Sequence, residues 1–249
     1  MIYSKKLRQF KNISHSFFDS TGGCSNGIYK SLNCGYGSND KKINVSKNLK
    51  IVSKKIGCKS SNLVFLNQVH SSKFYFIKKK TKKKLKGDGL ITNKRGLAIA
   101  ILTADCAPIL FYDNKKKIIG AAHAGWRGAY KKIIVKITKY LLKKGSNLNN
   151  LYFVVGPSIA QKNYEIGKEF KKKFIKQKEK NKKYFKNFKN KILFSLCDYI
   201  KGQLEDLGIK NIEIIKKDTY NRKNNFFSSR RSKKNNHDYG RNISIIMIK

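Results

Sequence analysis

The sequence predicts a single α+β domain over residues 1–249. Three observations support this fold class: short apolar runs rich in β-branched and aromatic residues, segments with helical periodicity between them, and the lack of an internal repeat or linker. A chain of 249 residues in which 40% are hydrophobic is long enough to bury a sizeable core. We therefore expect strands and helices packed in one globular unit.

The predicted strands are apolar runs, and several of them show no polar alternation. Continuous apolar runs are typical of strands that are buried on both faces. In chain order, the predicted strands cover residues 63–69, 73–77, 96–102, 108–113, 117–124, 151–156, 211–217 and 242–248.

Helices are indicated where apolar residues recur every three to four positions. The clearest helix covers 128–144 and stops at Gly145, and a second covers 192–207 and stops at Gly208. A less regular pattern indicates a third helix over 44–57.

The chain carries a formal net charge of +43, with 57 basic and 14 acidic residues. Only seven of the basic residues are Arg, and the Lys residues are spread through most of the chain. This distribution indicates a compositional background, and the Lys runs at 78–84 and 171–183 are expected to be solvated loops or faces. The segment 168–191, in which Phe and Tyr are spaced among Lys, is either an amphipathic helix or an excursion from the domain.

The charge also leaves a non-enzymatic alternative, a basic nucleic-acid-binding protein. That alternative predicts Arg and aromatic residues clustered on one face, whereas the Lys excess here is diffuse, so we expect no specific nucleic-acid partner. Adhesion to polyanions at low salt is expected in any case.

No segment is predicted to cross a membrane or to direct secretion. The longest apolar run, LAIAILTADCAPILFY, is interrupted by Asp105, and the N-terminus lacks an apolar signal core followed by a cleavage site. The five cysteines have no CxxC spacing, so no disulfide framework is expected. We expect a cytoplasmic protein with no membrane partner, and the oligomeric state stays open, with a monomer as one alternative.

Polar residues follow three of the predicted buried strands. His70 ends NQVH, Cys106 lies in TADCAP, and His123 lies in AAHAGWRG. If the three segments converge, two imidazoles and a thiolate suit zinc with a fourth position left open, which is the arrangement of a catalytic site. The alternative is that each side chain is an ordinary hydrogen-bonded or apolar core residue, because separations this long are not diagnostic alone.

Six segments taken in order carry a resemblance to a known family: NQVHSSKF, GDGLIT, LTADCAPILFYD, AAHAGWRGAY, VGPSIAQKNYEIG and FFSSRR with GRNISII. They resemble the signature segments of the YfiH-like family, also called laccase-domain or multicopper polyphenol oxidase proteins. The resemblance covers almost the whole chain. It implies a single α+β domain with mixed β-sheets packed together and flanked by helices, and a Zn²⁺ site at His70, Cys106 and His123.

The resemblance further implies purine nucleoside phosphorylase activity on adenosine, inosine and methylthioadenosine, together with adenosine deaminase activity. Purine nucleosides and phosphate are then the expected partners. Zinc would activate water for attack on the purine carbon that bears the amino group. Phosphorolysis needs a bound phosphate, and Arg is the residue suited to bidentate anion binding.

Candidate catalytic residues are Cys106, Asp105, Asp88 and Arg127. The two carboxylates are the candidate acid and base, and either one could instead orient a ligand imidazole. The candidate substrate-binding residues are Asn67 and Gln68 for the base, Arg230 and Arg231 for phosphate, and Trp126 for stacking on a purine. Strand-end capping for the amides, ion pairs for the arginines and core packing for Trp126 are the alternatives.

Two other activities and one other metal are the alternatives at this point. Cys106 could act without metal as a nucleophile, with His70 or His123 as its base, in a hydrolase that edits peptidoglycan precursors. The family name suggests a polyphenol oxidase, but four unpaired histidines cannot supply a multicopper centre. One copper ion in the same site is the remaining alternative to zinc.

Overall fold

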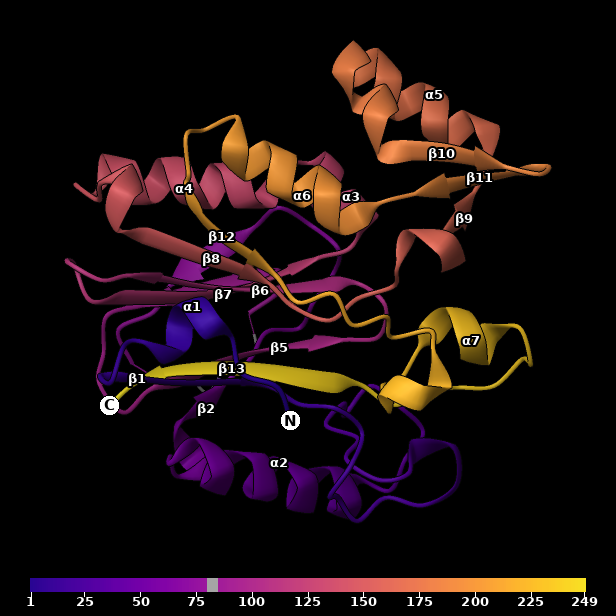
Figure 1. The fold of residues 1–249 in the computed structure, drawn as a ribbon. Coiled ribbons are helices and arrows are strands. Elements are labelled where there is room, and N and C mark those ends of the chain that lie inside the picture. Colours follow the sequence, from indigo (N-terminus) through magenta and orange to yellow (C-terminus); the bar gives the residue numbers. More distant parts are fainter. Residues whose placement is uncertain (80–84) are drawn as a thin grey trace.

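The computed structural model describes residues 1–79 and 85–249, and it has an α+β fold with mixed β-sheets (Figure 1). The six-stranded sheet contains β3 (Phe74–Phe76), β4 (Gly89–Thr92), β6 (Ala107–Asp113), β7 (Ile118–Ala124), β8 (Leu151–Val155) and β12 (Asn211–Ile214), in the spatial order β12–β8–β6–β7–β4–β3. The four-stranded sheet contains β1 (Ile13–Phe17), β2 (Leu63–Val64), β5 (Ala98–Thr103) and β13 (Asn242–Ile248), in the order β1–β13–β5–β2. A third sheet has the order β10–β11–β9, with β9 at Glu165–Ile166, β10 at Phe185–Phe188 and β11 at Lys191–Phe194.

The two larger sheets pack face to face and share a core. Leu110, Ile119 and Val154 of the six-stranded sheet belong to the same buried cluster as Ile99 and Ile101 of the four-stranded sheet. Successive side chains of a strand point to opposite faces, so the alternate residues of β5, Ala98 and Ala100, lie in a different cluster on the outer face. The apolar runs are therefore buried on both faces, as their composition predicts.

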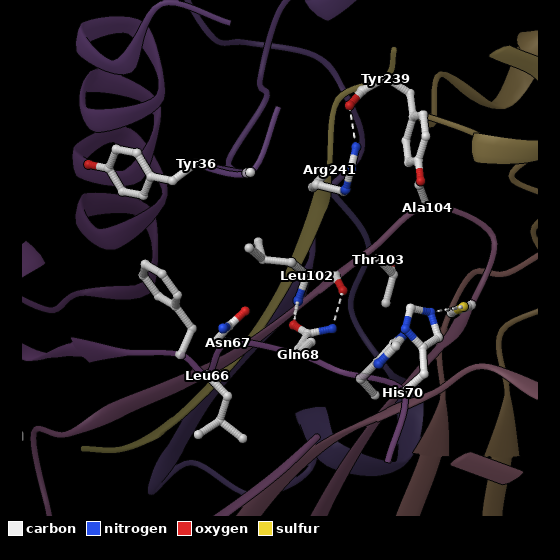
Figure 2. A pocket seen from close by; sticks show the side chains of 15 residues that line it. Tyr36, Leu66, Asn67, Gln68, His70, Leu102, Thr103, Ala104, Tyr239 and Arg241 are labelled. Carbon is white, nitrogen blue, oxygen red and sulfur yellow. Dashed lines mark hydrogen bonds between the residues drawn. The ribbon is translucent and has the colours of Figure 1, made fainter. Parts of the chain in front are cut away.

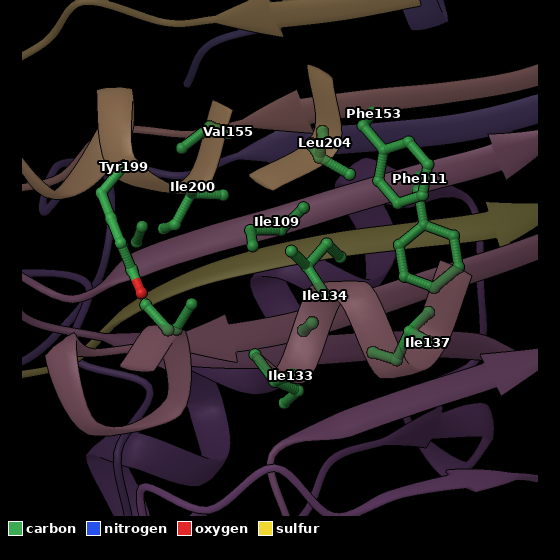
Figure 3. Packing of buried hydrophobic residues seen from close by; sticks show 14 of the residues in the cluster. Ile109, Phe111, Ile133, Ile134, Ile137, Phe153, Val155, Tyr199, Ile200 and Leu204 are labelled. Carbon is green, nitrogen blue, oxygen red and sulfur yellow. The ribbon is translucent and has the colours of Figure 1, made fainter. Parts of the chain in front are cut away.

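Helices cover the outer face of each of these sheets. Figure 1 shows α2 (Lys42–Ile56) below the four-stranded sheet, and α3 (Trp126–Tyr130), α4 (Ile133–Lys143) and α6 (Leu196–Glu205) above the six-stranded sheet. Ile134 and Ile137 of α4 pack with Ile109 and Phe111 of β6, as Figure 3 shows. Burying one such Ile side chain contributes about 1.5–3 kcal/mol to stability. The remaining helices are α1 (Lys5–Arg8), α5 (Lys168–Gln177) and α7 (Ser229–Lys233).

The predicted helix over 128–144 is two helices. α3 ends at Tyr130 and α4 begins at Ile133, because Lys132 between them has a left-handed backbone with φ 59° and ψ 43°. Apolar periodicity does not detect a break of this kind, since Ile133 and Ile137 keep their helical spacing on the far side of it.

The predicted helix over 192–207 begins later, at Leu196, because residues up to Phe194 belong to β11. The segment 168–191 contains part of each alternative, since it begins with the helix α5 and continues through a 3₁₀ stretch at Glu179–Tyr184 into β10, with β11 starting at its last residue. Its aromatic residues pack on one another, with the rings of Phe170 and Phe174 stacked at 4.6 Å. Phe174 also contacts the rings of Tyr130 and Tyr199, so the spaced aromatic residues join the main core on the helical side of the six-stranded sheet.

Most of the other predicted strands are confirmed, with one large change. The run 63–69 forms only the two-residue strand β2, and the chain from Phe65 onward leaves the sheet as a loop.

In the part of the chain that the structure describes, no helix is both long and apolar enough to span a bilayer. Residues 80–84 of the predicted Lys loop at 78–84 lie outside the described residues.

Candidate metal centre and adjoining pocket

The side chains of His70, Cys106 and His123 meet at one point of the fold. Their ligand atoms all lie within 4.8 Å of one another. The Cys106 Sγ and His70 Nε2 atoms are 3.8 Å apart, and the centroids of the two imidazole rings are separated by 4.7 Å. The structure thus brings together the three residues that the sequence singles out as metal ligands.

His70 and Cys106 lie on the segments where the chain passes from the four-stranded sheet to the six-stranded sheet. His70 lies in the loop that runs from β2 in the four-stranded sheet to β3 in the six-stranded sheet, and Cys106 lies where β5 gives way to β6. His123 comes from β7, where it pairs with Pro108 of β6. Both crossings contain strained backbone, with a φ of 56° at His70 and 80° at Asp105.

Asp88 orients the buried imidazole of His123. Its Oδ1 atom is 2.8 Å from His123 Nδ1, and its Oδ2 atom accepts hydrogen bonds from the amide and the hydroxyl of Ser71, both at 2.6 Å. Burial alone would raise the pKa of Asp88, but the hydrogen bonds from His123 and Ser71 hold it at about 2. In the neutral form of His123, a proton on Nδ1 leaves the Nε2 lone pair free for another partner.

Cys106 and His123 also shift each other's pKa. Burial alone would raise the pKa of the Cys106 thiol, yet His123 and His70 lower it to about 6. Burial would lower the pKa of His123, but the Cys106 sulfur and the Asp88 carboxylate raise it to about 9. The site therefore favours a thiolate near neutral pH, which is the form of Cys that binds metals and attacks electrophiles.

The donor set fits a divalent metal ion such as Zn²⁺. It consists of one thiolate and two imidazoles, and the exposure of His70 opposite the buried His123 leaves one side accessible. A hydrogen-bonded carboxylate behind one imidazole is the usual support for a zinc-bound His. Gly125 gives the sulfur its space, because a Cβ atom at that position would lie 2.7 Å from Cys106 Sγ.

A pocket of about 520 Å³ opens beside the three residues (Figure 2). Its wall consists of the C-terminal end of β5, the loop around residue 67, the glycine-containing loop at 35–37 and the chain that enters β13. The lining residues are Gly35, Tyr36, Gly37, Phe65, Leu66, Asn67, Gln68, His70, Leu102, Thr103, Ala104, Cys106, His123, Tyr239 and Arg241.

Of the two amides predicted to contact a base, only Asn67 has its side chain available. Gln68 is engaged with the backbone of Leu102, since its Nε2 donates to the Leu102 carbonyl at 2.7 Å and its Oε1 accepts from the Leu102 amide at 2.8 Å (Figure 2). Gln68 thus holds the loop against β5. This contact agrees with strand-end capping, the alternative role given above for the two amides. Asn67 is exposed and lines the pocket.

Asp105 does not line the pocket, because its carboxylate points into the chain that follows β12. Oδ1 accepts from Thr219 Oγ1 at 2.7 Å, and Oδ2 accepts from the Ser228 hydroxyl at 3.0 Å and the Arg230 amide at 2.6 Å. Burial raises the pKa of Asp105. With both oxygens occupied, this carboxylate holds the turn that carries Cys106.

The predicted phosphate-binding arginines and Trp126 do not line the pocket either. Arg231 donates to the carbonyls of Thr219, Tyr220 and Phe226. The remaining three side chains have partners elsewhere: Arg230 donates to the Glu165 carbonyl at 2.9 Å, Arg127 lies over the ring of Trp126 at 5.3 Å, and Trp126 packs against Phe170 at 5.1 Å. Trp126 is half-buried and packs against the main core, outside the lining of this pocket.

Sequence reasoning missed Arg241, which does line the pocket. The signal was present, since Arg241 is one of only seven arginines and lies in the segment GRNISII. Its location depends on how β13 pairs with β5, which no local pattern reveals.

Comparison with known proteins places this site in a family. Residues 14–249 match the model of a family described as multi-copper polyphenol oxidoreductase laccase. The chain belongs to this family. One relative of this chain is a purine nucleoside phosphorylase of Rickettsia conorii. The two are 37% identical over 194 residues, which cover 77% of this chain and 80% of the relative. A purine nucleoside phosphorylase of Bacteroides thetaiotaomicron is 31% identical over 256 residues, with 93% and 91% covered.

The fold agrees with solved structures. The crystal structure of the hypothetical protein YfiH of Bacillus licheniformis has 28% sequence identity and a TM-score of 0.87, and it covers 95% of this chain and 93% of that protein. A Neisseria meningitidis protein has 26% identity and a TM-score of 0.86, with 96% and 95% covered. The α+β fold expected from the YfiH-like resemblance is thereby confirmed.

Proposed function

We propose that this chain is a purine nucleoside phosphorylase that acts as one domain and holds Zn²⁺ between His70, Cys106 and His123. The observation that carries the proposal is the convergence of two imidazoles and a thiolate at a pocket of about 520 Å³, a volume typical of small-molecule sites. The names of the relatives from R. conorii and B. thetaiotaomicron support the reaction class. Copper in the same site is the alternative to zinc.

In phosphorolysis an oxygen of inorganic phosphate forms a bond to ribose C1′ while the bond from C1′ to purine N9 breaks. The electron pair of that bond and one proton go to the purine, and the products are ribose 1-phosphate and the free base. His70, Cys106 and His123 would hold the metal ion, which would supply a Lewis acid to the reaction. Asp88 keeps the His123 ring fixed, and Phe65, Leu66 and Leu102 offer the base an apolar wall.

The proposed substrates are adenosine, inosine and methylthioadenosine, and the proposed second activity is adenosine deamination. Asn67 supports a purine because its amide can both donate to and accept from the edge of a base. The Lewis acid supports deamination, since hydrolytic removal of the amino group requires an activated water molecule.

One observation favours a second candidate, a hydrolase with Cys106 as its nucleophile. Cys106, His123 and Asp88 are linked in the order nucleophile, base and orienting carboxylate, and the pKa of Cys106 is lowered to about 6. Such an enzyme would act on an amide such as that of a peptidoglycan precursor. A multicopper oxidase is not favoured, because in the described residues only one group of three or more potential ligands is found, and it includes just two imidazoles.

The deciding experiment is incubation of the purified protein with adenosine, with and without phosphate, followed by separation of adenine, inosine and hypoxanthine. Adenine that forms only with phosphate indicates phosphorolysis, and inosine that forms without phosphate indicates deamination. We expect His123→Ala to lose both activities and His237→Ala, at an exposed histidine outside the cluster, to keep them. Unchanged products from His123→Ala would show that the assigned site is wrong.

Metal content separates the two candidates. We expect about one zinc per chain by elemental analysis, and loss of zinc in Cys106→Ala. A covalent acyl adduct on Cys106 in protein that holds no stoichiometric metal would instead favour the hydrolase.

A further inference from the structure

The pocket carries a single cationic side chain. Although Lys is the commonest basic residue of the chain, no Lys and no carboxylate appears among the described residues that line the pocket, and Arg241 is its one permanent positive charge. A general excess of surface Lys does not explain an Arg at this place. An Arg provides a planar pair of donors, which a Lys does not.

The guanidinium of Arg241 is held in a fixed plane. Its Cζ atom lies 3.7 Å from the centroid of the Tyr239 ring, and its Nη1 atom donates to the Tyr239 carbonyl. The backbone amide of Arg241 donates to Asn33 Oδ1 at 2.9 Å. Gly35 provides room for the stem of the side chain, because a Cβ atom there would lie 2.3 Å from Arg241 Cγ.

Part of the guanidinium has no protein partner. Within residues 1–79 and 85–249, no carboxylate lies within ion-pair distance of Arg241, and no hydrogen bond involves its Nη2 or Nε atom. The carboxylate of nearby Asp238 is engaged elsewhere, since it accepts from the Tyr29 hydroxyl at 2.7 Å and from the Asn39 amide at 2.8 Å. Burial would raise the pKa of Asp238, but its hydrogen bonds and the nearby charge of Arg241 lower it, so the two groups attract each other without forming an ion pair. The Nη2 and Nε donors of Arg241 therefore stay open to a second anion.

The strand register places this charge beside the candidate metal centre. Asn242 of β13 pairs with Thr103 of β5, so Arg241 continues toward Ala104, two residues before Cys106. Figure 2 shows Arg241 and His70 on the wall of the same pocket. An anion on Arg241 therefore lies in the space that a substrate of the metal centre would share.

We infer that Arg241 forms an anion subsite that binds inorganic phosphate through its Nη2 and Nε donors, as the co-substrate of the phosphorolysis proposed above. The inference rests on that function for the role of the anion, but the subsite itself rests on the geometry. Arg127, Arg230 and Arg231, which the sequence favours for this task, are not among the residues that line the pocket.

Arg241→Gln tests the subsite, with Arg95→Gln as the matched control, because Arg95 is an exposed arginine that does not line the pocket. Titration calorimetry with inorganic phosphate at constant ionic strength measures binding without turnover. We expect Kd for phosphate, and KM for phosphate with inosine, to rise about 10- to 100-fold in Arg241→Gln, as for the loss of charge-assisted hydrogen bonds. Arg95→Gln and the zinc content of both variants should be unchanged, and Arg241→Lys should restore binding only in part.

The outcomes separate this inference from the proposed function. Phosphate-dependent cleavage in the wild type with an unchanged phosphate Kd and KM in Arg241→Gln would overturn the subsite and leave the function standing. Arg241-dependent phosphate binding without nucleoside cleavage would support the subsite and overturn the function. If inosine 5′-monophosphate binds more tightly than inosine, and only when Arg241 is present, the subsite takes the phosphate of an ester and the co-substrate role is wrong.

Discussion

Gly125 shows how little space separates the groups of the candidate metal centre. It is the N-cap of α3 with φ −73° and ψ 175°, a conformation that any residue can adopt. A Cβ atom there would nevertheless lie 2.7 Å from Cys106 Sγ and 3.0 Å from His70 Cδ2. The absence of a side chain at Gly125, two residues after His123, is thus explained by the closeness of the sulfur and the second imidazole.

We expect Gly125→Ala to weaken zinc binding by about 10- to 100-fold, the range for changes in the groups that support a metal ligand. Competition with a chelator measures this affinity. Gly167→Ala is the control, because Gly167 is also the extended N-cap of a helix, α5, and a Cβ atom there meets nothing within 4 Å. Equal zinc affinity of the two variants would contradict the crowding argument.

Residue types indicated the candidate side chains, but their partners decide what each can do. The positions of His70, Cys106 and His123 in the sequence left their convergence open, and the family resemblance is what implied the ligand set. The engagement of Gln68 with Leu102, and of Asp105 with Ser228, depends on contacts between segments far apart in the chain. Arg241 was overlooked for the same reason.

At the scale of elements, the apolar patterns predicted most strands and the faces they bury. β13 has the predicted bounds, and α2 and α6 lie within a few residues of theirs. The patterns failed where a single backbone conformation divides a periodic run, as at Lys132, and where a run leaves its sheet, as after Val64. Such breaks are decided by packing between elements, which a window of sequence does not contain.

Lys132→Gly should stabilise the protein by about 0.5–1 kcal/mol, because glycine adopts a left-handed backbone without the steric cost borne by Lys. Lys131→Gly is the control at the neighbouring exposed position, where φ is −76° and glycine should destabilise. Urea denaturation of both variants measures the free energy of unfolding. A loss of stability in Lys132→Gly as large as in Lys131→Gly would mean that the strain at this break is negligible.

At the scale of the whole molecule, the net charge of +43 opposes compaction. Carboxylates are few, and among the described residues the lysines that form ion pairs are Lys172, Lys178, Lys180, Lys191 and Lys201. Most of the positive charge is therefore balanced only by ions in solution.

We expect the melting temperature to rise when NaCl increases from about 0.01 M to about 0.1 M, since the Debye length falls from about 30 Å to about 10 Å and self-repulsion weakens. Differential scanning calorimetry in a buffer without phosphate measures the melting temperature at each salt concentration. The same series in KCl tests whether the effect depends on ionic strength and not on the identity of the cation. A melting temperature that is flat or falls with both salts would show that repulsion among the lysines does not limit stability.

Two of the three candidate metal ligands lie on the stretches of chain that pass from one large sheet to the other. Neither sheet in isolation can assemble the site, because the thiol and the first imidazole reach their places only after the two sheets have docked. Binding of a metal ion would therefore require that the two sheets have docked. A folding intermediate in which only one sheet is formed would not bind the ion.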